Sequence, residues 1–347
     1  MPSTWKQSLQ IASTYIGTVV GAGFASGREI IEFFVQYGTQ GLIGIFLAAL
    51  LFSWSGVQVM LIAHRLQASS YHQVSTYLFG KALGTLFNIV LIAVMLGTTS
   101  VLLAASGAVF VETFQVSAQI GIWFSMVCIF LVAANGLKGI HSVNSLFVPT
   151  LILFTLFVFL YNQPWRIAEG DSFILEVIKP WIWLKSPLYY VALNVCLTQA
   201  VLVPIGKESK SERPLIIGGL LGGLGIGLLL FLSYCSMQVH LPNVLLAEMP
   251  NIYMLSGVGK GISIAFALLV YAEVFSSLVA NVFGLAQQMN RWVPVSPSLV
   301  LLGILGISYL ISFVGFSSLL TLLYPLFGQI VVFFLLMLAV RQWRYKY

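Results

Sequence analysis

Glycine and charge lie together near the start of the chain, in the stretch GTVVGAGFASGREI at residues 17–30. Glycine lets a chain leave helical geometry and lets its backbone approach a ligand closely. The N–H and C=O groups released in this way can bind a small solute or a cation. Small residues can also serve close helix packing, but the adjacent charges favour a functional helix break at Val20–Gly23, with a helix restarting near Phe24.

Three glutamates fall within apolar segments: Glu29, Glu32 and Glu273. An unpaired carboxylate at a helix centre costs about 2.5 kcal/mol or more on insertion scales. The more central Glu273 could accept a proton, bind a cation or balance an amine; the plain alternatives are an ion pair with Arg28 or a protonated carboxyl bonded to the break. Arg28, Glu29 and Glu32 are candidate gate residues or an interfacial ion pair.

The composition requires a membrane around these groups. Of 347 residues, 59% are hydrophobic and 7% are charged, whereas soluble domains are about 25% charged. The net charge of +6 comes without a basic patch interleaved with aromatic residues, so no nucleic-acid partner is expected. The histidines and cysteines form no metal or nucleophile–base pattern. We therefore expect no transition metal, no cofactor and no enzymatic activity.

A helix needs about 20 apolar residues to cross a bilayer, and ten segments meet this need. They are residues 7–37, 41–65, 84–110, 118–136, 142–161, 186–206, 214–238, 258–289, 298–315 and 318–340. With a cytoplasmic N-terminus, eleven lysines and arginines fall in inner loops and four in outer loops. This bias predicts a multi-pass protein of the cell membrane with both termini in the cytoplasm.

The segments divide into two halves of five, residues 1–162 and 186–347, joined by an extracellular loop at 163–185. An odd number of spans gives the halves opposite orientations, as in inverted-repeat transporters. The second half opens with NVCLTQAVLVPIG at 194–206, which predicts a second interrupted helix. Paired breaks indicate a binding site near the midplane. The glycines of GGLLGGLGIG at 218–227 have no polar companions and instead predict close helix packing.

The run G-T-V-V-G-A-G-F at 17–24 resembles the first-helix break of LeuT-like transporters, the amino acid–polyamine–organocation group. The longer run to residue 30 resembles the opening of the YkvI-type family of bacterial membrane proteins, and that resemblance covers the whole chain. The resemblance implies an all-α membrane protein of ten transmembrane helices in a five-plus-five inverted repeat, with helices 1 and 6 interrupted.

In LeuT-like sodium symporters, one sodium ion is held by carbonyls of the first-helix break and by two hydroxyls of the eighth span. The resemblance places these carbonyls on Gly17 and Val20 and the hydroxyls on Ser276 and Ser277, with the Glu273 carbonyl completing the shell. Oxygen ligands of this kind suit a hard cation. The implied coupling ion is one Na⁺, with H⁺ through Glu273 as the alternative.

The same resemblance places a substrate between the first and sixth spans. The candidate binding residues are Gly21, Ala22, Gly23, Phe24, Ala25, Asn194, Val195 and Thr198. Backbone N–H groups beside a carboxylate suit an amino acid or another small amine. The sequence thus predicts a secondary active transporter that works by alternating access and needs the lipid bilayer but no obligate protein partner. A non-transporting ligand sensor or receptor subunit on the same fold is the alternative.

Overall fold

The computed structural model describes residues 4–135, 140–166, 181–255, 257–289 and 296–344, and all regular structure in these residues is helical. The long helices are α1 (Thr4–Val19), α4 (Thr39–Leu66), α6 (Lys81–Phe114), α7 (Ala118–Asn135), α8 (Ile140–Asn162), α9 (Ile182–Glu208), α10 (Glu212–Gln238), α12 (Lys260–Met289), α13 (Pro297–Ser312) and α14 (Phe316–Arg344). Short elements join them: α2 (Ala22–Ser26), α3 (Arg28–Phe33), η1 (Val35–Tyr37), α5 (Tyr71–Phe79), η3 (Pro164–Arg166), η4 (Asn243–Leu246) and α11 (Pro250–Tyr253).

Six of these helices, α4, α6, α9, α10, α12 and α14, are long and apolar enough to cross a bilayer. Shorter apolar helical stretches lie in α7, α8 and α13, and the predicted first span is divided among α1, α2 and α3. The chain is therefore an all-helical membrane protein. Most of the predicted connecting loop, residues 167–180, lies outside the described residues.

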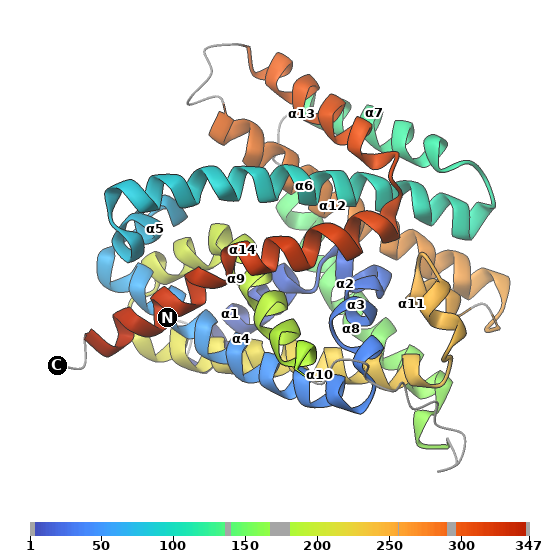
Figure 1. Cartoon of the computed structure of the whole chain (residues 1–347), viewed down its shortest axis with the longest axis horizontal. Coiled ribbons are helices and arrows are strands. Elements are labelled where there is room, and N and C mark those ends of the chain that lie inside the picture. The colour runs from blue at the N-terminus through green and yellow to red at the C-terminus, as the bar shows by residue number, and fades with distance from the viewer. Residues whose placement is uncertain (1–3, 136–139, 167–180, 256, 290–295, 345–347) are drawn as a thin grey trace.

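The long helices form two groups (Figure 1). In the first, α10 packs on both α1 and α4, and α9 packs on α4. In the second, α6 contacts α7, α12 and α13. Helix α14 contacts both α9 and α6, and α2 contacts α12, so the broken first segment lies where the two groups meet.

Glycines bring α10 close to its two neighbours, as the sequence predicts for residues 218–227. A β-carbon at Gly222 would come within 2.6 Å of a ring carbon of Tyr15 on α1, and one at Gly223 would overlap the backbone of Ser53 on α4. Only a residue without a side chain permits this approach, and the gain is van der Waals contact between helices.

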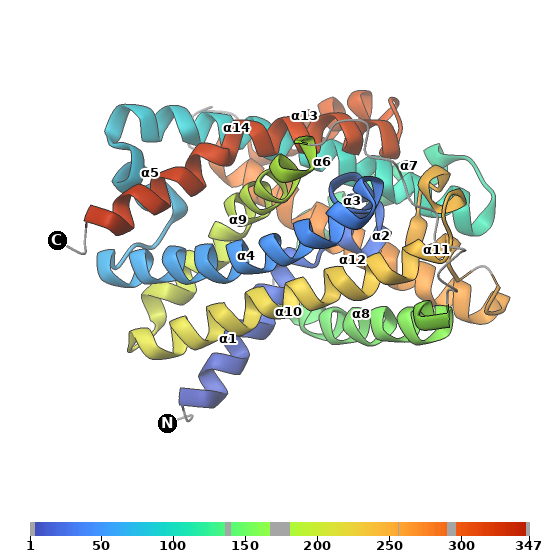
Figure 2. The same ribbon diagram turned by 60° about the horizontal axis from the view of Figure 1, so that its bottom comes forward.

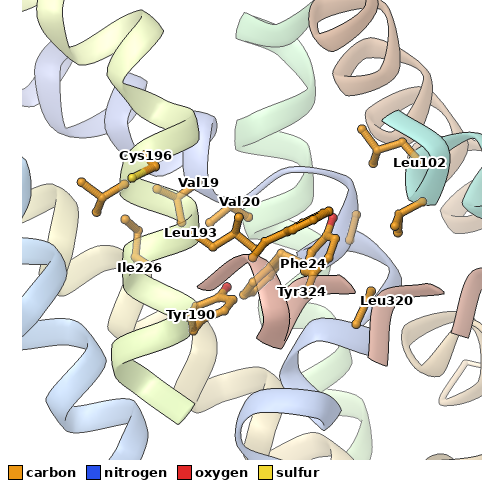
Figure 3. Packing of buried hydrophobic residues seen from close by; sticks show 14 of the residues in the cluster. Val19, Val20, Phe24, Leu102, Tyr190, Leu193, Cys196, Ile226, Leu320 and Tyr324 are labelled. Carbon is orange, nitrogen blue, oxygen red and sulfur yellow. The ribbon is translucent and has the colours of Figure 1, made fainter. Parts of the chain in front are cut away.

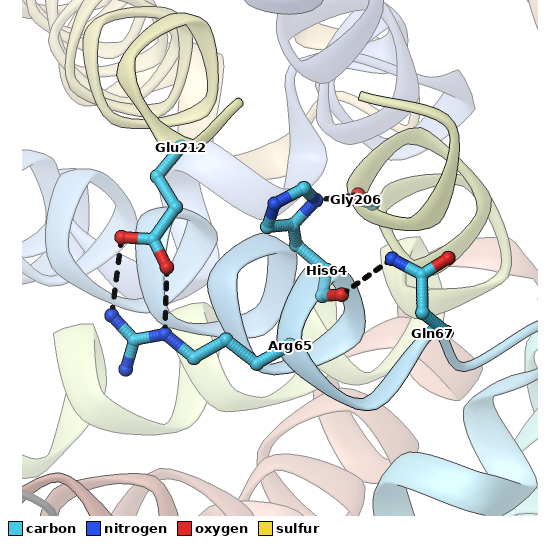
Figure 4. A network of polar contacts seen from close by, with 5 residues as sticks. All are labelled: His64, Arg65, Gln67, Gly206 and Glu212. Atoms are coloured by element: carbon cyan, nitrogen blue, oxygen red, sulfur yellow. Dashed lines mark hydrogen bonds and ion pairs between the residues drawn. The ribbon is translucent and has the colours of Figure 1, made fainter. Parts of the chain in front are cut away.

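Both chain termini lie at one end of the molecule, and α11 lies towards the other end (Figure 2). At the terminal end Arg65 of α4 forms a bidentate ion pair with Glu212 of α10, at 2.8 and 3.2 Å. His64 Nδ1 lies 3.1 Å from the Gly206 carbonyl of α9 (Figure 4). These contacts tie α4 to α9 and α10. Four of the cations used for the predicted orientation lie outside the described residues: Lys138, Lys179, Arg291 and Lys346.

Candidate functional site

The first segment breaks where the glycines predict. Helix α1 ends at Val19, α2 begins at Ala22, and Gly21 between them is extended, with φ −98° and ψ −153°. The Gly21 N–H donates to the Val19 carbonyl at 2.9 Å, so it turns away from the carbonyl of Gly17, its helical acceptor. The predicted break is confirmed in place but is shorter than predicted: it comprises Val20 and Gly21, and the helix restarts at Ala22 and not near Phe24.

A second interruption lies at Gly27 and was not predicted. Gly27 is left-handed, with φ +84°, a conformation that favours glycine. A β-carbon there would also come within 2.7 Å of Met237 and 2.8 Å of the Asn251 side chain. The turn separates α2 from α3 and directs α3 back across the end of α2.

The loop between α10 and α12 covers the end of α2. Asn251 of α11 donates its amide hydrogens to the carbonyls of Phe24 (3.1 Å) and Ala25 (3.0 Å). Arg28 donates from Nη1 to the carbonyls of Leu245 (2.7 Å) and Ala247 (3.2 Å). The carbonyls released at Gly27 are thus bonded by a loop that is more than 200 residues away in sequence.

Helix α12 meets the break through its serine pair. The Ser277 hydroxyl lies so close to Gly21 that a β-carbon on the glycine would be 3.2 Å from its oxygen. Ser276 and Glu273 are buried on the same helix, and Glu273 is 4% exposed. Its Oε1 has no hydrogen-bond partner among the described residues. The alternative of a Glu273–Arg28 ion pair is not formed, because Arg28 is directed to the loop between α10 and α12.

Glu29 of α3 lies against α2, across the Gly27 turn. The side chain is 5% exposed and folds back onto Gly23, where a β-carbon would overlap its carboxyl group. The phenols of Tyr190 on α9 and Tyr324 on α14 face the carboxyl. Glu32, one turn later, is half-buried and contacts the Gln36 side chain.

The predicted interruption of the sixth span is wrong. Helix α9 is continuous from Ile182 to Glu208 and contains Pro187 and Pro204. Its polar side chains bond to the helix itself: Asn194 donates to the Tyr190 carbonyl (3.0 Å) and Thr198 to that of Val195 (3.2 Å). Side chains that bond to the preceding turn are compatible with an unbroken helix.

Helix α1, which leads into the break, nevertheless packs on α9. In Figure 3, Val19 and Val20 lie beside Leu193 and Cys196, while Phe24, Tyr190 and Tyr324 gather below them. Phe24, Ala25, Asn194, Val195 and Thr198 are all buried. The side chain of Ala22 lies outside the described part.

Two contributors were missed by the sequence reading, Asn251 and Tyr324. Neither belongs to a motif, and each reaches the break from a distant element. Charge or glycine spacing gave no signal for either residue, since their relevance depends on which helices pack together.

Relatives of the chain fit this architecture. No family model matches it. It is 36% identical over 335 residues to the uncharacterized membrane protein YkvI of Bacillus subtilis (strain 168), covering 94% of this chain and 93% of that protein. It is 26% identical over 337 residues to the uncharacterized protein YyaD of the same organism, with 96% of each chain covered.

Solved structures share the fold. The inward-facing conformation of Mhp1 matches with a TM-score of 0.60 and 12% identity, covering 93% of this chain and 73% of that one. Mhp1 in a closed conformation with bromovinylhydantoin bound, described as a nucleobase-cation-symport-1 family transporter, matches with a TM-score of 0.51 and 14% identity, covering 96% and 74%. The fold is therefore LeuT-like. With the YkvI match along nearly its full length, this chain belongs to the YkvI family of bacterial membrane proteins.

Proposed function

We propose that the chain is a secondary active transporter that moves a small organic solute across the cell membrane by alternating access. The observation that carries the proposal is the broken α1–α2 segment, buried between α9 and α12 with a hydroxyl of Ser277 beside Gly21. Irregular backbone at membrane depth is tolerated where it is enclosed by protein or lines a cavity. Its occurrence in a LeuT-like fold supports transport and not enzymatic chemistry.

The proposed substrate is an amino acid or another small amine. Its anionic end meets the backbone N–H groups of Gly21–Ala25, where the N-terminus of α2 favours negative charge. Asn194, Val195 and Thr198 form the facing wall on α9. The buried carboxylate of Glu273 balances the amine.

Na⁺ is the first candidate for the coupling ion, held by the carbonyls of Gly17, Val20 and Glu273 and the hydroxyls of Ser276 and Ser277. The contact between Ser277 and Gly21 supports this assignment, because it joins the two elements that supply the ligands. A proton is the alternative coupling ion, and the buried Glu273 is its candidate carrier.

The proposed architecture has ten spans in two inverted halves, from residues 1–162 and 186–347. Helix packing supports it, because equivalent helices of the halves associate: α1 with α9, α4 with α10, and α6 with α12. Both termini are proposed to be cytoplasmic, and their position at one end of the molecule (Figure 2) supports an even number of crossings.

The proposal can be tested first by ligand-dependent stability. A solute or ion that binds only the folded protein increases the free energy of unfolding by about 2.7 kcal/mol at a concentration of 100 Kd. The melting midpoint therefore rises. The detergent-purified protein is screened with Na⁺ against K⁺ at fixed ionic strength and with a library of small amines. We expect Na⁺ to stabilise the wild type and the exposed control Ser298→Ala, but not Ser277→Ala.

Flux then distinguishes the candidate functions. An amine that stabilises the protein should accumulate in proteoliposomes under an inward Na⁺ or proton gradient. Binding without flux under either gradient would contradict the transporter and support the sensor alternative. Equal responses to Na⁺ and K⁺ would remove the sodium site while leaving proton-coupled transport to be measured.

A further inference from the structure

We infer that Glu29 is the proton-binding residue of the helix break. The sequence alone predicts Glu273 as the proton-coupling residue and Glu29 as a gate residue. The inference rests on the proposed function for its role in coupling, but proton binding itself can be measured without any transport.

The first argument is the surroundings of the carboxyl. The Glu29 side chain is buried in a segment flanked by apolar residues, among them the fully buried Ile30. Its polar neighbours are the phenols of Tyr190 and Tyr324. The Tyr190 hydroxyl lies beside the carboxyl and has no hydrogen-bond partner among the described residues. The Glu29 carboxyl and the Tyr190 hydroxyl are thus buried side by side, and neither phenol supplies a positive charge that would stabilise an ionised Glu29 carboxylate.

The second argument is that the charged side chains near Glu29 contact other groups. Arg28, the adjacent cation, donates to the carbonyls of Leu245 and Ala247. Glu32 points toward Gln36. The phenols on the other packed elements also face elsewhere: Tyr37 of η1 lies near Glu32 and Ser186, and Tyr234 of α10 donates to the Gly38 carbonyl.

The third argument is space. The carboxyl lies against Gly23 so closely that even a methyl group would overlap it. A metal cation needs a shell of several oxygens, whereas a proton needs no coordination space. Neutralisation by a proton also removes the cost of a bare carboxylate at membrane depth.

The position of Glu29 gives the proton a mechanical consequence. The residue lies on α3, its carboxyl rests on α2 across the Gly27 turn, and it faces α9 and α14. The protonated carboxyl can donate to a phenolic oxygen and keep these four elements together. Loss of the proton leaves a carboxylate that favours water, and therefore favours opening of the break. Glu273 instead lies on the uninterrupted α12, and its Oε1 has no hydrogen-bond partner among the described residues.

The test is pH-difference infrared spectroscopy of the purified full-length protein, which reports the C=O band of a protonated carboxyl as it ionises. We expect the double variant Glu32→Gln/Glu273→Gln, which leaves Glu29 intact, to retain the wild-type band and Glu29→Gln to lose it. The melting midpoint should fall as the pH rises in the wild type and in Glu32→Gln, but not in Glu29→Gln. Glu32→Gln is the matched control because it lies one turn away on the same helix.

A band that disappears in the double variant and persists in Glu29→Gln would overturn the inference. If Glu29→Gln does not fold, the double variant alone decides, since the presence or absence of its band is sufficient. Failure of the transport proposal would look different: the Glu29 band would be present, but no proton or sodium gradient would drive uptake in proteoliposomes.

Discussion

Single polar groups decide whether the break in the first segment can exist inside a membrane. The carbonyls at the end of α2 are bonded by Asn251, and the turn that exposes them depends on Gly27. A buried polar group that loses its partner costs about 1–3 kcal/mol. The turn at Gly27 is therefore stabilised by the loop between α10 and α12 as well as by its own glycine.

We expect Asn251→Ala to destabilise the protein by about 1–3 kcal/mol, because the buried Ala25 carbonyl loses its donor and the Phe24 carbonyl keeps only the Gly27 N–H. The measurement is the melting midpoint in detergent. Asn243→Ala is the control, since Asn243 is exposed on η4 in the same loop. Equal midpoints for the two variants would show that the loop does not stabilise α2.

The buried carboxyls show a limit of sequence reading at this scale. The sequence shows that Glu29, Glu32 and Glu273 each place a carboxyl group in an apolar segment, where an unpaired carboxylate costs free energy. Their environments differ, however: Glu29 is enclosed against Gly23 and two phenols, Glu32 is half-buried, and Glu273 has an unbonded oxygen. These differences come from α9, α12 and α14, so spacing along one helix could not predict them.

The first segment is interrupted after α1, whereas α9 is continuous, and their residues explain the difference. Both segments carry helix-disfavouring residues, but α1 breaks at Val20–Gly21 while α9 continues through Asn194, Thr198 and Pro204. Glycine removes the conformational preference for the helix. Asparagine and threonine keep it when they bond to the previous turn, so polar residues alone were a poor predictor of interruption.

The glycines of α10 have the opposite role, which gives a test of packing. We expect Gly223→Ala to cost about 1–3 kcal/mol, a typical penalty for overpacking, because the methyl group would overlap the Ser53 backbone on α4. Gly303→Ala in α13 is the matched control, since nothing lies within 4 Å of its added β-carbon. The comparison uses melting midpoints, and similar losses in both variants would contradict the role of Gly223 in helix approach.

For the molecule as a whole, the proposed transport depends on the arrangement of the two helix groups. Helix α14 contacts both groups, whereas α1 packs in the first group and α2 contacts α12 and α6 of the second. The loop between α10 and α12 covers the end of α2. A rearrangement of one group against the other would alter the contacts of Glu29, Ser277 and Asn251 together. This linkage is what an alternating-access mechanism requires.

Orientation in the membrane can be tested at Leu246, which is 87% exposed on η4. In a variant without Cys128, Cys196 and Cys235, we expect Leu246→Cys to react with a membrane-impermeant maleimide added to intact cells, because its loop is predicted to be extracellular. A cysteine at the exposed Leu66, near the terminal end, should react only after permeabilisation. The reverse pattern would contradict the predicted orientation.

The sequence by itself determined the membrane class, the position of the long helices, the break at Val20–Gly23 and the packing role of residues 218–227. These features follow from local composition, since apolar length, glycine content and helix periodicity act within one segment. Only the tertiary structure decided that α9 stays continuous, that Gly27 adds a second turn, and that Asn251, Tyr190 and Tyr324 reach the break. Such contacts join residues far apart in the chain, so their energies depend on which helices meet and not on any single segment.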